Sequence, residues 1–118
     1  MSDIERWVPD SLWEIAAPLI PPAPTRPQGG GRRRIHDRTV LAAIVYLTEA
    51  GCSWWQLPEQ TFAVSRATAH RRFTEWTAAG LWPRLHQAVL DRLGAEGRLD
   101  WSRAVVDSIA VRAEKGGT

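Results

Sequence analysis

Asp107, near the end of the chain, is the residue whose position most strongly suggests chemistry. It stands at the centre of the apolar stretch "AVVDSIAV", residues 104–111, whose length and β-branched residues predict a short buried strand. Burying an unpaired carboxylate costs on the order of several kcal/mol, so a chain usually keeps one there only where a metal ion, a cation or a reaction uses it. Asp107 is therefore a candidate catalytic and metal-binding residue.

A second candidate site is basic. Residues 26–72 contain eight arginines and three acidic residues, a net charge of +5, whereas the rest of the chain carries −3. Such a cluster of guanidinium groups on a small domain is the electrostatic signature expected for a polyanionic partner. A solvated basic loop is the alternative explanation for any single run of arginines.

Part of this basic region has the pattern of a helix-turn-helix. The segment "SWWQLPE" predicts a short first helix, and "QTFAV" predicts the turn that follows it. Ser65 comes next and is placed to cap the N-terminus of a second helix. The order of these segments therefore predicts that the second helix is a recognition helix.

The second helix has two distinct faces. Ala69, Phe73 and Trp76 recur at helical spacing and predict the stripe that packs in the core. The opposite side is small, polar and basic, with Ala67, Arg71 and Thr74 on the face, His70 beside them, Arg66 and Thr68 in the first turn, and Arg72 at the seam.

An exposed face of this kind suits the major groove of double-stranded DNA. An α-helix fits that groove, arginine can donate two hydrogen bonds to guanine, and serine, threonine and histidine can reach phosphates or base edges. A helix whose outer face is merely soluble is the alternative interpretation. The candidate DNA-binding residues are Arg32, Arg33, Arg34, Arg38, Ser65, Arg66, Thr68, His70, Arg71 and Arg72.

The remaining segments predict a mainly α-helical fold. Further helices are expected from Asp10 or Ser11 to Pro21, over residues 35–51 and over residues 81–97. A flexible basic linker rich in proline, glycine and arginine is expected at residues 22–35. We therefore expect a helical helix-turn-helix DNA-binding domain over residues 1–97, and the first strand of an incomplete catalytic domain over residues 98–118.

Composition excludes several classes of protein. With 118 residues, 44% hydrophobic and 24% charged, the chain is expected to form one modest core. The longest apolar run, residues 41–47, is far shorter than the roughly 20 residues that span a bilayer, and there is no signal-peptide pattern. Cys52 is the only cysteine, and the three histidines do not stand at ligand spacing from it, so neither a disulfide nor a zinc site is expected. A cytoplasmic, nucleoid-associated protein is expected, with no membrane partner.

Five segments cover nearly the whole chain: "VPDSLWEIAAPLIPP", "GGGRRRIHDRTVLAAIVYLTEAG", "GCSWWQLP", "RRFTEWTAAGLWPRL" and "VVDSIAVRA". Taken together, they resemble the N-terminal part of bacterial insertion-sequence transposases of the insertion-sequence-five group. The resemblance implies that the chain binds transposon terminal inverted repeats in double-stranded DNA. Two further partners stay open, the downstream transposase portion and a second copy of the chain.

The same resemblance implies a role for Asp107. Transposases of this group have a ribonuclease-H-like catalytic domain with a DDE or DDD acidic triad, and Asp107 matches its first acid on its first strand. Such acids hold Mg²⁺ for phosphodiester cleavage and strand transfer. The other acids would lie beyond Thr118, so this chain alone is expected to be inactive and to need no Mg²⁺.

Several alternatives stay open from the sequence. The chain is either a first reading frame joined to the rest by frameshifting or a truncated copy, and it either activates or inhibits transposition. A stand-alone helix-turn-helix regulator is a second functional class. An all-α dimerisation module, which would show no salt-sensitive DNA binding, is a third.

Overall fold

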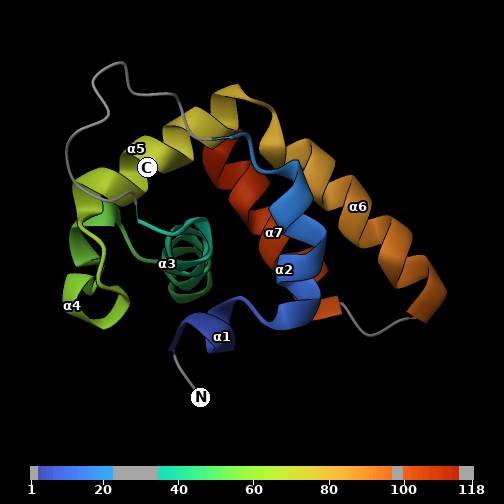
Figure 1. Ribbon diagram of the computed structural model, residues 1–118, viewed down its shortest axis with the longest axis horizontal. Coiled ribbons are helices and arrows are strands. Elements are labelled where there is room, and N and C mark those ends of the chain that lie inside the picture. The colour runs from blue at the N-terminus through green and yellow to red at the C-terminus, as the bar shows by residue number, and fades with distance from the viewer. Residues whose placement is uncertain (1–2, 23–34, 97–99, 115–118) are drawn as a thin grey trace.

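The protein is mainly α-helical, as its sequence predicts. A computed structural model describes residues 3–22, 35–96 and 100–114, and within these ranges there is no β-strand. Figure 1 shows how the helices enclose α3, which is seen end-on in the middle of the molecule. The elements are α1 (Asp3–Trp7), α2 (Asp10–Ala16), η1 (Ala17–Leu19), α3 (Asp37–Ala50), η2 (Trp54–Gln56), α4 (Glu59–Phe62), α5 (Arg66–Ala78), α6 (Leu81–Glu96) and α7 (Asp100–Glu114).

The helix α3 is the centre of the fold because it is apolar on every side. Every residue from Val40 to Val45 is buried, and so is Leu47. A helix that is hydrophobic all round must be covered all round, and α1, α4, α5 and α7 pack against it. The helix ends at Gly51, whose φ of 68° lies in the left-handed region that glycine adopts without steric cost.

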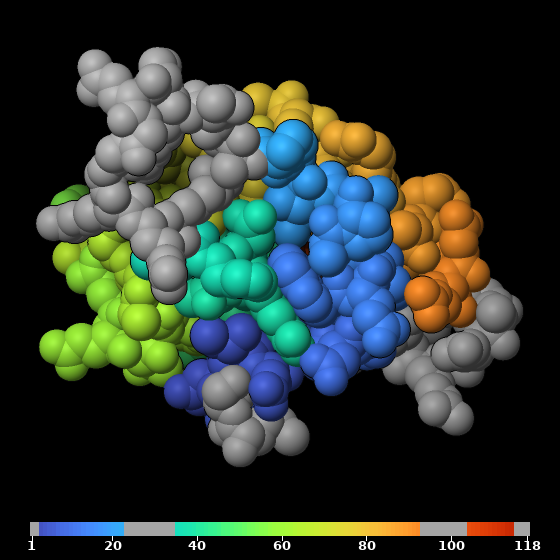
Figure 2. All heavy atoms as spheres, in the orientation of Figure 1, coloured from blue at the N-terminus to red at the C-terminus, as the bar shows by residue number. Residues whose placement is uncertain are grey.

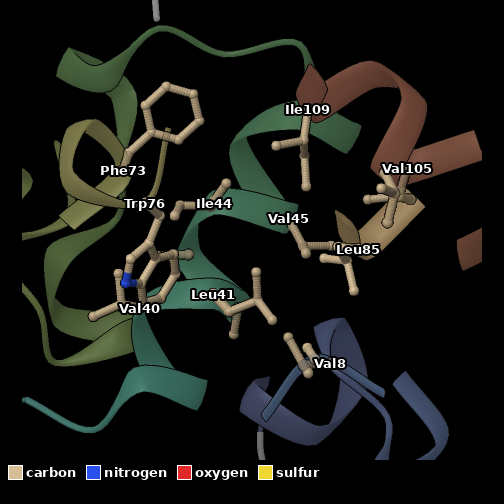
Figure 3. Packing of buried hydrophobic residues seen from close by; sticks show 14 of the residues in the cluster. Val8, Val40, Leu41, Ile44, Val45, Phe73, Trp76, Leu85, Val105 and Ile109 are labelled. Atoms are coloured by element: carbon tan, nitrogen blue, oxygen red, sulfur yellow. The ribbon is translucent and has the colours of Figure 1, made fainter. Parts of the chain in front are cut away.

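The core brings together segments that are far apart in the sequence. Figure 3 shows Leu41 and Ile44 of α3 between the aromatic rings of α5 on one side and the aliphatic side chains of α6 and α7 on the other. Phe73 and Trp76 belong to the buried stripe predicted for α5, and their burial confirms that prediction. The orientation of α5 is therefore fixed by its contact with α3.

Residues 104–111 form part of the helix α7, so the predicted strand is wrong. Val105, Val106 and Ile109 are buried and stand at helical spacing, and α7 packs against α6 and α3. A short apolar run fits both periodicities, and here packing against two helices decides in favour of the helix. The domain expected to begin at residue 98 thus starts, in the part that is described, with a helix that shares the core of α3.

The helical conformation also removes the reason for treating Asp107 as a buried strand residue. Asp107 lies beside the buried stripe of α7, and its side chain is 48% exposed. Its Oδ1 is 2.6 Å from Nε2 of His86 on α6. In the described structure, Asp107 therefore links two neighbouring helices at the surface.

The structure addresses two further expectations, the basic linker and the lack of a membrane-spanning segment, only in part. The basic linker at residues 22–35, with Arg32, Arg33 and Arg34, lies outside the described residues except at its two ends. As for membranes, the described helices include none that is both long enough and apolar enough to cross a bilayer.

Replacing Trp76 tests the packing of α5 on α3. Trp76 is 1% exposed, so Trp76→Ala should lower the free energy of unfolding by about 3 to 5 kcal/mol. The matched control is Trp55→Ala, because Trp55 is exposed and its removal leaves no cavity; it should cost about 1 kcal/mol or less. Urea unfolding measures both, and equal losses would show that Trp76 does not anchor α5.

Candidate nucleic-acid interface

A short helix, a tight turn and a longer helix follow each other at α4 and α5, but not where the sequence predicted them. The segment "SWWQLPE", expected as the first helix, forms the 3₁₀ turn η2 and only the first residue of α4, whereas "QTFAV", expected as the turn, contains the rest of α4. Ala63 ends α4 with a φ of 54°, an uncommon left-handed conformation for a residue other than glycine. Phe62 and Val64, on either side of it, are both buried and hold the turn against the core. The strained turn is thus supported by packing, and it directs the chain into α5.

The N-terminus of α5 is capped twice. The Ser65 hydroxyl accepts a hydrogen bond from the backbone N–H of Thr68 at 3.1 Å, as the sequence predicts for an N-cap. Glu59, the first residue of α4, accepts a second bond at Oε2 from the backbone N–H of Arg66 at 2.7 Å. Because the Glu59 bond joins α4 to α5, the first turn of α5 is fixed relative to the turn that precedes it.

The outward side of α5 agrees with the face expected for a recognition helix. Opposite the buried residues, Ala67, His70, Arg71 and Thr74 are all exposed. Arg71 makes no hydrogen bond or ion pair with any other described residue, whereas the Thr74 hydroxyl donates to the backbone carbonyl of His70 at 3.0 Å. Glu75 is the acidic residue on the exposed side of this helix, and it lies near the C-terminal end.

Arg72 is not on the exposed face. Its side chain is 6% exposed, and Nη1 donates to the carbonyl of Ile35 at 2.7 Å and to Oδ1 of Asp37 at 3.1 Å. These contacts join α5 to the start of α3. Sequence periodicity placed Arg72 at the seam, but it does not give the reach of an arginine side chain, which here extends inward rather than toward solvent.

Arg38 is also occupied by contacts within the protein. Its Nη2 donates to the carbonyl of Val8 and to Oδ1 of Asp10, each at 2.8 Å. The bonds tie α3 to the start of α2, and Figure 2 shows the blue N-terminal residues directly beside the teal residues at the start of α3. Arg38 thus serves the same purpose as Arg72, which is to hold a neighbouring segment at the N-terminus of α3.

Arg66 is partly exposed to solvent and partly engaged in contacts within the protein. Its side chain is partly exposed, Nη1 donates to the carbonyl of Trp55 at 2.9 Å, and the guanidinium carbon lies 5.3 Å from the centre of the Trp55 ring. Oε1 of Glu59 lies 3.7 Å from Nη2 of Arg66. The guanidinium is therefore held over an aromatic ring at the start of α5 while part of it faces solvent.

Trp55 is the surface residue that the sequence analysis did not single out. It is 81% exposed, whereas Trp54 beside it packs edge-on against Phe73 and His70. Consecutive residues of a short 3₁₀ turn point in different directions, so a tryptophan doublet is a signal that one ring faces outward. A groove of about 570 Å³ opens at this point, lined by Trp54, Trp55, Glu59, Ser65, Arg66, Ala67 and His70.

The described residues do not form a metal centre. Among them, no group of three or more His, Cys, Asp and Glu side chains is arranged to hold an ion. Asp107 faces His86 rather than a second carboxylate. The donor set around Asp107 therefore does not fit a two-metal site within this part of the chain, and the catalytic assignment rests on the family resemblance alone.

Comparisons with known proteins identify the family. Residues 8–86 match the family described as "Putative transposase of IS4/5 family", and this span contains α2 to α5 and the start of α6. The chain is also 39% identical, over 111 residues, to the "Insertion element IS402 uncharacterized 16.2 kDa protein" of Burkholderia cepacia; the alignment covers 93% of this chain and 76% of that protein. No solved structure matches the chain. The chain therefore belongs to the IS4/5 transposase family, in agreement with the resemblance of its sequence.

Proposed function

We propose that this chain is a DNA-binding part of an IS4/5-type transposase, in which α4, the turn and α5 act as a helix-turn-helix. The helix α5 would lie in the major groove of the terminal inverted repeats. The observation that carries the proposal is the exposed face of α5, where His70 and Arg71 stand beside the small residue Ala67 with no acidic side chain among them. A small side chain at the centre of the face allows the helix to approach base edges closely.

The rigidity of this face supports the same proposal. Base recognition needs a helix held in one orientation, and α5 is held by its buried stripe, by its two N-terminal caps and by Arg72. The caps hold the first turn, and the bonds of Arg72 hold the second. These are the turns from which helix-turn-helix proteins contact bases.

The candidate residues divide into two groups on this basis. Ser65, Arg66, Thr68, His70 and Arg71 surround the start of the exposed face and are proposed as DNA contacts, together with Arg32, Arg33 and Arg34, which lie outside the described residues. Arg38 and Arg72 are proposed as positioning residues instead, since their guanidinium groups are bonded within the protein.

Catalysis is proposed only for a complete transposase. There, the resemblance implies Asp107 as the first acid of the triad, a role that its position on a helix and its pair with His86 do not support within the described residues. Contacts with a downstream transposase portion or with a second copy of the chain belong to the same proposal.

Salt dependence tests DNA binding directly. We expect the protein to bind duplex DNA with an affinity that falls steeply with ionic strength, by about 0.9 log unit per log unit of salt for each phosphate neutralised. Fluorescence anisotropy with a labelled duplex at several salt concentrations gives the slope. A flat dependence, or no binding at low salt, would contradict the proposed function and favour an all-α dimerisation module.

Two adjacent arginines provide a matched test of the interface. Arg71→Ala should weaken DNA binding and reduce sequence preference while leaving the melting temperature unchanged, because Arg71 is exposed and makes no contact with other described residues. Arg72→Ala should lower the free energy of unfolding by about 2 kcal/mol or more, because it leaves Asp37 and the Ile35 carbonyl without this donor. If both substitutions destabilise the protein equally, the division into contact and positioning residues is incorrect.

Asp107→Ala separates the structural role of this residue from the catalytic one. The pair with His86 is half-exposed, so its loss should cost about 1 kcal/mol or less. Duplex binding should be unchanged, and neither version of this chain should cleave DNA in the presence of Mg²⁺. Mg²⁺-dependent nicking by the unmodified chain that disappears in Asp107→Ala would show that Asp107 already acts as a catalytic acid here.

A further inference from the structure

Trp55 is an unusual residue to leave in solvent. It is 81% exposed, although a tryptophan side chain gains more than most others from burial. Its neighbour Trp54 packs against α5, so the same short segment places one ring inside and the other outside. The exposed ring stands next to the first turns of α5, where the proposed DNA contacts begin.

The exposed ring is also held in place. The 3₁₀ turn η2 is closed by a bond from the backbone N–H of Ser53 to Oε1 of Gln56 at 2.9 Å, and Leu57 behind it is buried. Arg66 fixes the turn from the other side, since it donates to the Trp55 carbonyl and lies over the ring. Trp55 is therefore a preorganised platform, with its guanidinium partner already in position.

The groove beside Trp55 has the chemistry of a site for a flat, polar-edged ring. Its walls include both tryptophans and His70, which offer stacking and edge contacts, while Ser65 and Glu59 offer polar atoms. Arg66 lines the groove, and Arg71 is exposed one residue beyond His70. An aromatic surface beside cationic side chains matches a nucleobase on its phosphate backbone better than an aliphatic side chain.

We infer that this groove binds one unpaired nucleobase, which stacks on Trp55 while the adjoining phosphate is attracted by Arg66 and Arg71. The inference rests on the proposed function and extends it. In that function the protein would read paired bases with α5 and hold a single unstacked base with η2. The base could belong either to a distorted duplex or to a single strand, since both present the same unpaired ring.

Three labelled DNA probes test the inference. They are a 20-base-pair duplex of arbitrary sequence, the same duplex with one unpaired thymine at its centre, and the thymine-containing strand alone. At low salt, we expect the bulged duplex to bind about fivefold or more tightly than the paired duplex, the difference that stacking of one base supplies. Binding of the single strand that depends on Trp55 would identify that strand as a second source of the base.

Substitutions of Trp55 test whether its ring causes the preference for the bulged duplex. Trp55→Ala should remove the preference for the bulged duplex and leave affinity for the paired duplex within about twofold. Trp55→Phe should retain part of the preference, because phenylalanine still stacks. Val111→Ala, which removes an exposed apolar residue from α7, is the control and should change neither affinity. Thermal melting of each variant shows that it remains folded.

The outcomes separate this inference from the proposed function. Equal affinity of the unmodified protein for paired and bulged duplexes would overturn the inference alone, as would a preference that survives in Trp55→Ala. An equal loss of affinity for both duplexes in Trp55→Ala would place the ring against paired DNA and also overturn it. If neither duplex binds but the single strand binds through Trp55, the proposed recognition of duplex DNA fails and the base-binding groove stands.

Discussion

The burial of α3 on all sides is the constraint on which the rest of this structure depends. A helix without a polar face cannot lie on the surface of a small protein, because each exposed apolar side chain would forgo its transfer free energy. Four other helices therefore pack against it from different directions. The same constraint gives α7 its place, since Val105, Val106 and Ile109 of α7 cover one side of α3.

Arginine side chains bind neighbouring segments together at the two ends of α3. Arg72 and Arg38 hold α5 and the start of α2 at the N-terminus, whereas Arg112 of α7 donates to the carbonyl of Cys52 at 2.8 Å, just beyond the C-terminus. Burial lowers the pKa of the Arg112 guanidinium, and the nearby Cys52 acts weakly in the opposite direction. The bond to the Cys52 carbonyl and the negative end of the α3 dipole offset part of this desolvation cost. Arg112 also lies 5.9 Å from the centre of the Trp54 ring, so α7 supports the segment that carries Trp55.

The sequence predicts the helices well where capping and periodicity agree. Gly51 closes α3, Ser65 caps α5, and the stripe of Ala69, Phe73 and Trp76 is buried as expected. It fails at α4, which forms within the predicted turn, and at α7, where a short, largely apolar segment is compatible with either periodicity and only tertiary packing decides.

The candidate interface could also be predicted from the sequence only in part. The exposed positions of His70 and Arg71 follow from the helical period, but the inward direction of Arg72 depends on partners more than thirty residues away in the sequence. The contact between Trp55 and Arg66 joins η2 to α5 across α4, and no local sequence pattern predicts it.

Residues 71 and 72 show how this fold places a buried, bonded arginine next to an exposed one. One turn of α5 carries an arginine bonded into the protein and, next to it, an arginine without a described partner. Because successive residues of a helix differ in direction by about 100°, neighbouring positions can serve opposite purposes. Substitutions at Ala67, His70 or Arg71 would change the surface that α5 presents without disturbing its contact with α3. Related chains can therefore differ on this surface while keeping one core, provided that the buried stripe and Arg72 stay in place.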